Sequence, residues 1–325
     1  MKPADFHPDN FERGARYTLE LELGHAARNI SLPVLLVRGS RPGKRLVVTA
    51  AVHGDEYEGV RAIYDVVRGL DPAVMSGDFL SVPVANPPAF WNGTRSSPLD
   101  DGNLARLFPG SLAAGPTAAI AYYMAPAIIA QADLFLDLHS AGIKWLMPTL
   151  IGYDAGDVRS RDAAYAFGAP VMWGHPGMAP GRTITFADEH NIPWLYTEAH
   201  GAGRIVPEDL NIFVDGVWNL LRHLEIVPGP LRTAPLERHL YGDGNIDRGV
   251  LAGQRGFLLT DARLFQRFRV GDELGRLINL LGETLETYRA PTDGVLAMIR
   301  AFPVVEPGDP VFLLTDLLED VPQAG

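Results

Sequence analysis

The sequence predicts an α/β protein in which helices cover both faces of a mixed, mostly parallel sheet, followed by a small all-β domain. Three observations support this prediction. Strand-like and helical segments alternate between about residues 30 and 225, the expected strands are almost continuously apolar, and the chain changes character after a proline-rich stretch. Alternating elements with fully apolar strands are typical of a parallel sheet that is buried on both faces.

The expected strands are short runs of apolar and β-branched residues, and they cover residues 31–37, 46–52, 79–85, 134–138, 148–152, 170–173 and 193–198. Apolar residues at helical spacing predict helices between them, at residues 58–70, 118–132, 158–167 and 207–224. In sheets of this kind, ligands bind beyond the carboxyl ends of the strands. Functional side chains are therefore expected at those ends.

The stretch 227–235 contains three prolines and a glycine, which interrupt any regular element. Beyond it, short apolar runs are separated by Gly-Asp and proline turns, a pattern typical of small β domains. We therefore expect a first domain at residues 1–228 and a small β domain at residues 235–325.

Composition excludes several classes of protein. The chain has 325 residues and no cysteine, so disulfides, thiolate nucleophiles and cysteine-bound metals are absent, and His and carboxylate side chains must hold any metal. Its formal charge of −11 disfavours a nucleic-acid partner. Because no apolar run is long enough for a membrane span and no signal sequence is visible, we expect a cytoplasmic protein without a membrane partner. The sequence leaves open whether the chain forms a homo-oligomer.

A candidate metal site begins where the second expected strand ends. His53 and Glu56 follow this strand directly, and His139 follows the strand at residues 134–138. Two His and one carboxylate with an open fourth position form the ligand set of hydrolytic zinc sites. The alternative is that Glu56 simply begins a helix, where its charge is favoured by the helix dipole. These residues alone leave both interpretations open.

Further polar residues lie at the same strand ends. Glu198 ends the strand at residues 193–198, where it is either a catalytic carboxylate or an ordinary surface residue. Asp137 precedes His139 by two positions and either orients its imidazole or caps the strand, and Asp55 is a turn residue or a partner of the ligands. His175 and His200 are weaker candidates for contact with a substrate or a metal.

Five motifs in this order resemble the succinylglutamate desuccinylase and aspartoacylase family of the zinc carboxypeptidase-like superfamily. They are His53-Gly54-Asp55-Glu56, Asn86-Pro87-Pro88-Ala89, Asn103-Leu104-Ala105-Arg106-Leu107-Phe108-Pro109-Gly110, Asp137-Leu138-His139 and Thr197-Glu198. The resemblance covers residues 30 to 225. Within the family, the chain looks most like the bacterial deacylases that include N-acetyl-diaminobutyrate deacetylase.

The resemblance implies that residues 1–228 form a zinc-dependent catalytic domain. One zinc ion per chain would be bound by His53, Glu56 and His139. Glu198 would be the general base and acid, which takes a proton from water and delivers it to the leaving amine.

The resemblance also implies two anion-binding arginines in the loop at residues 91–109. Arg95 would polarise the scissile carbonyl and contact the substrate, and Arg106 would hold a substrate carboxylate. Both could instead be solvated surface residues. The family usually has Asn directly before the second arginine, whereas this chain has Ala105. An aspartate or glutamate product is therefore in doubt. The nearest amide is that of Asn103, which is therefore expected to bind substrate together with Arg95 and Arg106.

The expected function is that of a zinc-dependent amidohydrolase, a deacylase that cleaves the amide bond of a small N-acyl amino acid or related N-acyl amine. The alternatives are a metallocarboxypeptidase acting on short peptides and a non-catalytic metal-binding protein. Residues 235–325 resemble a biotinyl or lipoyl carrier fold, but they contain no lysine to which such a group could be attached. A cap, a substrate gate or an oligomer contact is the expected role of this segment.

Overall fold

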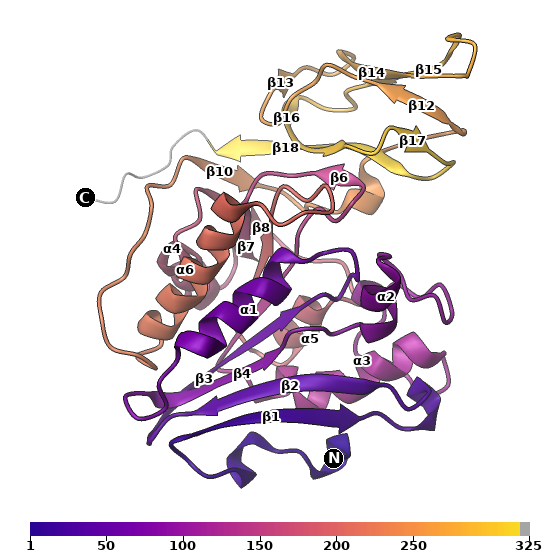
Figure 1. The fold of residues 1–325 in the computed structure, drawn as a ribbon. Helices are drawn as coiled ribbons and strands as arrows, with labels where there is room; N and C mark the ends of the chain where they lie inside the picture. The colour runs from indigo at the N-terminus through magenta and orange to yellow at the C-terminus, as the bar shows by residue number, and fades with distance from the viewer. Residues whose placement is uncertain (319–325) are drawn as a thin grey trace.

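The computed structural model describes residues 1–318, and these form an α/β fold with further strands stacked at one end (Figure 1). The predicted fold class is confirmed. The central strands of the main sheet are, in spatial order, β1 (Ala15–Glu22), β2 (Ser31–Arg38), β4 (Ser76–Val82), β3 (Arg41–Ala50), β5 (Leu134–Leu138), β9 (Trp194–Glu198), β7 (Leu150–Asp154) and β8 (Val171–His175). β3, β4, β5 and β9 run parallel to one another, whereas β1 and β2 pair antiparallel with their neighbours. β7 pairs antiparallel with β9 and parallel with β8.

Helices cover both faces of this sheet, as predicted. One face carries α1 (Glu58–Gly69), α4 (Val158–Phe167) and α6 (Pro207–His223), and the other carries α3 (Pro116–Ala127) and α5 (Thr183–Glu189) (Figure 1). Side chains alternate between the two layers along a strand. Leu134 and Leu136 pack under α1 and α6, whereas Phe135 between them packs with α3. This double burial explains why the central strands are almost continuously apolar.

Several element bounds differ from the predicted ones. β3 begins at Arg41 and ends at Ala50, because Ala51 takes a left-handed backbone conformation (φ 50°) that turns the chain out of the sheet. α3 ends at Ala127 and is followed by the 3-10 turn η5 (Ile129–Gln131), whereas one helix was expected up to residue 132. Pro126 in its last turn has no N–H to donate, which weakens the helix there.

The segment beyond the predicted linker is built of strands, as expected from its turns. They are β10 (Arg238–Tyr241), β11 (Val250–Leu251), β12 (Gly256–Leu259), β13 (Arg267–Phe268), β14 (Glu273–Ile278), β15 (Thr284–Arg289), β16 (Gly294–Arg300), β17 (Val304–Val305) and β18 (Pro310–Leu318). β15, β14, β12 and β17 form a separate four-stranded sheet. Residues 319–325 of the predicted small domain lie outside the described part of the chain.

Two of these strands extend the main sheet. β10 pairs in parallel with β8, and β18 pairs antiparallel with β10 and β16. The short strand β6 (Trp145–Leu146), which follows β5 in the chain, pairs with β16. The division into domains at residues 228 and 235 therefore stays a prediction, since backbone hydrogen bonds cross it. Among the described residues, no helix is both long and apolar enough to cross a membrane.

Candidate active site

The three strands that precede the candidate residues are neighbours in the sheet. β3 pairs in parallel with β5, and β5 pairs in parallel with β9, so their carboxyl ends meet at one edge. His53 lies in the turn after β3, His139 directly follows β5, and Glu198 is the last residue of β9. The topology therefore brings together side chains that are up to 145 positions apart in the sequence, since 198 − 53 = 145.

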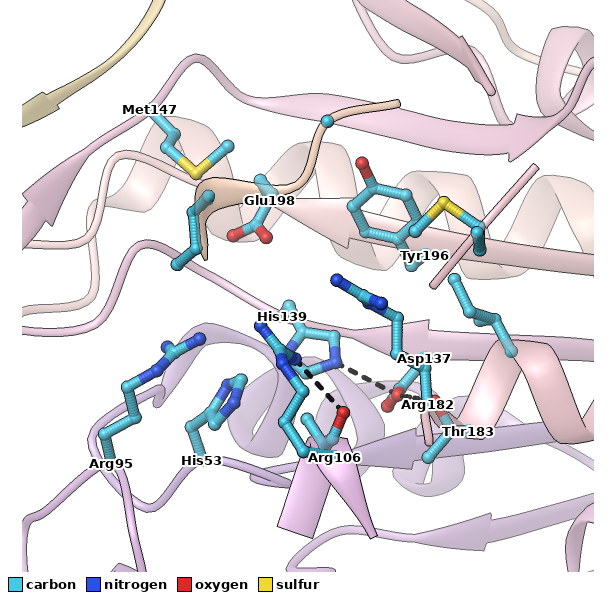
Figure 2. Close-up of a pocket in the computed structure, with 15 residues that line it drawn as sticks. His53, Arg95, Arg106, Asp137, His139, Met147, Arg182, Thr183, Tyr196 and Glu198 are labelled. Atoms are coloured by element: carbon cyan, nitrogen blue, oxygen red, sulfur yellow. Dashed lines mark hydrogen bonds and ion pairs between the residues drawn. The ribbon is translucent and has the colours of Figure 1, made fainter. Parts of the chain in front are cut away.

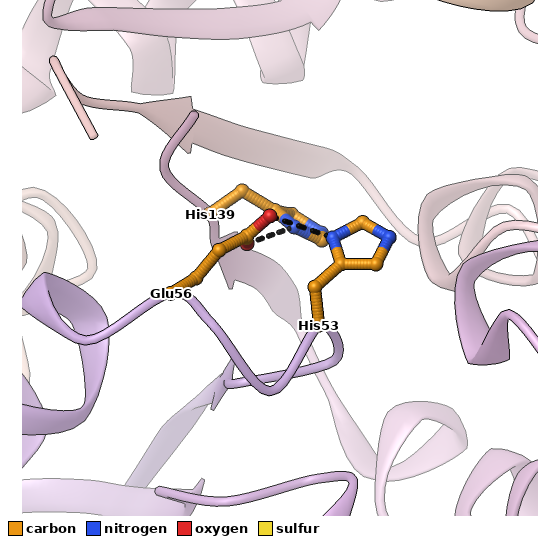
Figure 3. A group of neighbouring side chains, drawn as sticks. All are labelled: His53, Glu56 and His139. Atoms are coloured by element: carbon orange, nitrogen blue, oxygen red, sulfur yellow. Dashed lines mark hydrogen bonds and ion pairs between the residues drawn. The ribbon is translucent and has the colours of Figure 1, made fainter. Parts of the chain in front are cut away.

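His53, Glu56 and His139 form a compact cluster (Figure 3). Glu56 lies between the two rings, with Oε1 2.7 Å from His53 Nδ1 and Oε2 2.8 Å from His139 Nδ1. One ligand atom from each residue lies within 4.8 Å of the others. Two imidazole nitrogens and a carboxylate at this separation are a donor set suited to a divalent metal such as zinc.

The charges of His53 and Glu56 also fit a metal ion. Burial lowers the pKa of His53 to about 4, and the cation of Arg95 acts in the same direction. Burial opposes ionisation of Glu56, but the two imidazoles hold its pKa well below the usual range. His53 Nε2 is buried and without a hydrogen-bond partner among the described residues. A neutral imidazole beside an ionised carboxylate is the protonation state in which both groups bind a metal.

Asp137 orients the imidazole of His139. Its Oδ2 lies 3.0 Å from His139 Nε2, and the hydroxyls of Thr49 and Thr183 donate to its two carboxylate oxygens. Burial alone would lower the pKa of His139, but the carboxylates of Asp137 and Glu56 raise it well above the usual range. Asp137 thus binds the ring nitrogen that faces away from Glu56, which leaves Nδ1 directed into the cluster.

The turn after β3 is held against the loop that carries Arg95. Gly54 donates its backbone N–H to the Thr94 carbonyl at 3.0 Å, and a Cβ at this position would lie only 2.0 Å from the backbone carbon of Ala89. Only glycine fits such a close approach. Asp55, in the same turn, accepts from the Ile143 backbone N–H at 3.1 Å and is almost completely buried. Asp55 therefore fixes the segment that follows His139.

Glu198 faces this cluster across a small cavity that His53, His139 and Glu198 all line (Figure 2). Its Oε2 is buried and has no hydrogen-bond partner among the described residues. Burial raises the pKa of Glu198 to about 8, and the negative charge of Glu56 acts in the same direction. A carboxylate that titrates near neutral pH can both accept and release a proton, as a general base and acid must.

Arg95 and Arg106 both line the cavity, on the side opposite Glu198 (Figure 2). Arg95 Nη1 donates to Glu56 Oε1 at 3.2 Å, and its guanidinium lies over the Trp145 ring, 5.1 Å from the centroid. Asn103 lies on the adjacent outer groove rather than in this cavity, and its side-chain oxygen accepts from the Ala105 backbone N–H. The structure thus places both predicted arginines at the cavity and Asn103 outside it.

Three components of the cavity lining were not predicted from the sequence. Arg182, Tyr196 and the loop at residues 242–249, which follows β10, all contribute to its lining. Arg182 donates to the Ala179 carbonyl and to Asn245 in that loop, while Arg106 forms an ion pair of 3.0 Å with Asp247. Tyr196 could have been found from sequence, since it precedes Glu198 by two positions and therefore faces the same side of the strand.

The two weaker histidine candidates differ in position. His200 is half-exposed and pairs with Asp209 of α6, with Nδ1 3.1 Å from Oδ2. His175 is completely buried at the end of β8, where it bonds to the Gly242 carbonyl and to the Tyr196 hydroxyl. Neither residue lies in the cluster of His53, Glu56 and His139.

We expect His175 to make the protein less stable in acid. Burial lowers the pKa of His175 from 6.5 to about 4, so the folded ring stays neutral where the unfolded one binds a proton. The free energy of unfolding should fall as the pH decreases from about 6.5 to 4, by about 3 kcal/mol from this residue. Urea unfolding of the wild type and His175→Gln at several pH values tests this. An identical slope in both proteins would contradict it.

Comparison with known proteins identifies the family. The family model of the succinylglutamate desuccinylase/aspartoacylase catalytic domain matches residues 42–224, which is more than half of the chain and includes the whole cluster and Glu198. The chain belongs to this family. It is therefore related to deacylases that act on amide bonds, and the predicted resemblance is confirmed.

Similar proteins cover the chain almost from end to end. The N-alpha-acetyl-L-2,4-diaminobutyric acid deacetylase of Halomonas elongata is 31% identical over 98% of this chain and 95% of its own. The product-bound structure of the ectoine utilization protein EutE (DoeB) from Ruegeria pomeroyi has a TM-score of 0.85 at 26% identity, covering 94% of this chain and 96% of that one. A succinylglutamate desuccinylase from Silicibacter sp. has a TM-score of 0.83 at 26% identity, with the same coverage.

Proposed function

We propose that the protein is a zinc-dependent deacylase that cleaves the amide bond of a small N-acyl amino acid. The observation that carries this proposal is that a buried carboxylate without a partner, Glu198, shares one small cavity with a His–Glu–His cluster and with Arg95. A non-catalytic metal-binding protein would need neither Glu198 nor Arg95 in these positions. His53, Glu56 and His139 would hold the zinc ion, which supplies Lewis acidity and acidifies water when bound.

The chain's own side chains would carry out the proton transfers and stabilise charge. Glu198 would take a proton from the attacking water and deliver it to the amide nitrogen, so that the amine leaves in a neutral form. Arg95 would donate to the carbonyl oxygen as negative charge develops on it. Trp145 stacks under the guanidinium of Arg95 and limits the positions it can take. Asp137 would keep the ring of His139 in one orientation throughout the reaction.

Two findings support an amino acid with a carboxylate and an amino group as the amine part of the substrate. The Halomonas relative is named for the deacetylation of Nα-acetyl-2,4-diaminobutyrate. The cavity is lined by Arg106 and Arg182, which can bind a carboxylate, and by Glu198 and Tyr196, which offer acceptor groups. The loop at residues 242–249 closes part of this space, which favours short substrates over peptides.

The substrate class can be tested with a panel of N-acyl compounds. We expect zinc-loaded protein to hydrolyse Nα-acetyl-2,4-diaminobutyrate with a kcat/KM at least about a hundredfold above that for N-succinylglutamate or a dipeptide, because each misplaced group costs binding in a small closed site. Released amine is measured by chromatography. Formyl and longer acyl derivatives of the same amino acid define the acyl side of the cavity.

Two outcomes of this panel would contradict the proposal. A preference for dipeptides with a free carboxyl terminus would instead indicate a metallocarboxypeptidase. Zinc content near zero together with no hydrolysis of any acyl amide would indicate a protein without catalytic function.

A further inference from the structure

Tyr196 is joined to the loop at residues 242–249 through a buried histidine. The Tyr196 hydroxyl lies 2.8 Å from His175 Nε2, and His175 Nδ1 lies 2.7 Å from the carbonyl oxygen of Gly242. A carbonyl oxygen can only accept a hydrogen bond, so Nδ1 must carry the proton of this ring. His175 is completely buried and its pKa is lowered to about 4, so the ring is neutral and has one proton only. Nε2 is therefore an acceptor.

This arrangement fixes the direction of the Tyr196 hydroxyl. Because Nε2 accepts, the phenol must donate its single proton to His175. The lone pairs of the phenol oxygen then remain as its only free hydrogen-bonding capacity. Burial and the charge of Glu198 raise the pKa of Tyr196 well above its usual value, so the phenol keeps this proton. A partly exposed phenol in this state can bind a donor, such as an ammonium group, and cannot donate to a carboxylate.

Tyr196 lies on the same strand as the proposed general base, Glu198, and lines the same cavity. Tyr196 and Glu198 are two residues apart on β9, lie on the same side of the cavity, and face Arg95 and Arg106 across it (Figure 2). Two residues of a strand span roughly 6.6 Å. The two nitrogens of 2,4-diaminobutyrate are four bonds apart, or roughly 5 Å when extended. An extended diamino acid whose leaving nitrogen lies at Glu198 is thus long enough to span roughly the separation of these two positions on the strand.

We propose that Tyr196 selects substrates whose amine part carries a second, positively charged amino group, because His175 holds its hydroxyl as a hydrogen-bond acceptor. Tyr196 is thus a specificity residue, and His175 is a positioning residue that acts through it. This inference rests on the proposed deacylase function. It assigns the carboxylate of the substrate to Arg106 and the side-chain ammonium to Tyr196, with the negative charge of Glu198 and the positive charge of Arg182 both acting on the phenol.

Matched substrates test this assignment on the wild-type protein. Nα-acetyl-2,4-diaminobutyrate and N-acetylnorvaline have the same length and shape, but the second has a methyl group in place of the ammonium group. We expect kcat/KM to be roughly ten- to a hundredfold higher for the diamino compound, the usual effect of one hydrogen bond to a charged group. N-acetylaspartate, whose side chain is a carboxylate, should be poorer than N-acetylnorvaline.

The variant Tyr196→Phe removes the acceptor and keeps the ring. We expect this variant to lose most of the preference for the diamino compound, mainly through a higher KM, while its kcat/KM for N-acetylnorvaline stays within about threefold. Tyr153→Phe is a matched control, because Tyr153 also lies 2.8 Å from a histidine nitrogen, that of His239, but packs in the core away from the cavity. The control should leave the preference unchanged.

The possible outcomes separate this inference from the proposed function. If the wild type hydrolyses N-acyl amino acids but treats the diamino compound and N-acetylnorvaline alike, the role of Tyr196 is wrong and the deacylase function stands. An unchanged preference in folded Tyr196→Phe has the same meaning. If Tyr196→Phe does not fold, the wild-type comparison decides alone. If no N-acyl amino acid is hydrolysed, both proposals fail.

Discussion

Replacing Glu198 with Gln should lower kcat by about a thousandfold while the protein still binds one zinc ion per chain. The amide has nearly the same shape as the carboxylate but cannot take a proton from water. Its side chain faces the cavity rather than forming a hydrogen bond to the protein, since Oε2 has no partner among the described residues, so the fold should be preserved. Steady-state kinetics and elemental analysis of the same preparation measure the two quantities together.

A control replaces a carboxylate elsewhere. Glu189→Gln, at the exposed end of α5, should retain wild-type kcat and zinc content. Unchanged hydrolysis by Glu198→Gln would exclude this residue as the general base. Loss of zinc in the same variant would instead make Glu198 part of the metal-binding site.

Replacing His53 with Ala should reduce both zinc content and activity to near zero. Among residues 1–318 the cluster offers three ligands, and removal of one leaves an incomplete set that holds zinc weakly. Chelation of the wild type should have the same effect on activity, and added zinc should restore the chelated wild type but not His53→Ala. Elemental analysis after dialysis, followed by activity assays with and without zinc, measures this.

Asp137→Asn provides a graded comparison. Asp137 contacts His139 and is not one of the three proposed ligands, so its replacement should weaken zinc affinity by about ten- to a hundredfold without abolishing binding. Full activity of chelated wild-type protein would contradict a role for metal in the reaction.

The central elements could be predicted from sequence because their signals are local. β5 and α4 occur with the predicted bounds. A short apolar run marks the strand, and a helical pattern that starts after the capping residue Asp157 marks the helix. The meeting of His53, His139 and Glu198 followed from a general rule about the ends of parallel strands. β1 also had a local signal, the alternation of Tyr17, Leu19 and Leu21, but lies before the region in which strands were expected.

The part of the cavity formed by Arg106 and the loop at residues 242–249 could not be predicted in this way. Arg106 and Asp247 are 141 positions apart in the sequence, and nothing in either segment identifies the other as its partner. The pairing of β10 with β8 depends on strand order, which the proline-rich linker obscured by suggesting a separate domain. The direction of the Tyr196 hydroxyl depends on a backbone carbonyl, that of Gly242, which has no sequence signature at all.

The position of the loop after β10 has a consequence for how this family can diversify. The groups proposed for bond cleavage lie at the ends of β3, β5 and β9, whereas the loop that closes the cavity comes from a later part of the chain. Mutations in this loop can therefore reshape the cavity without replacing the proposed zinc ligands or Glu198. Hydrolytic chemistry and substrate choice can evolve separately on this scaffold, and new deacylase specificities could be engineered by exchanging residues 242–249 alone.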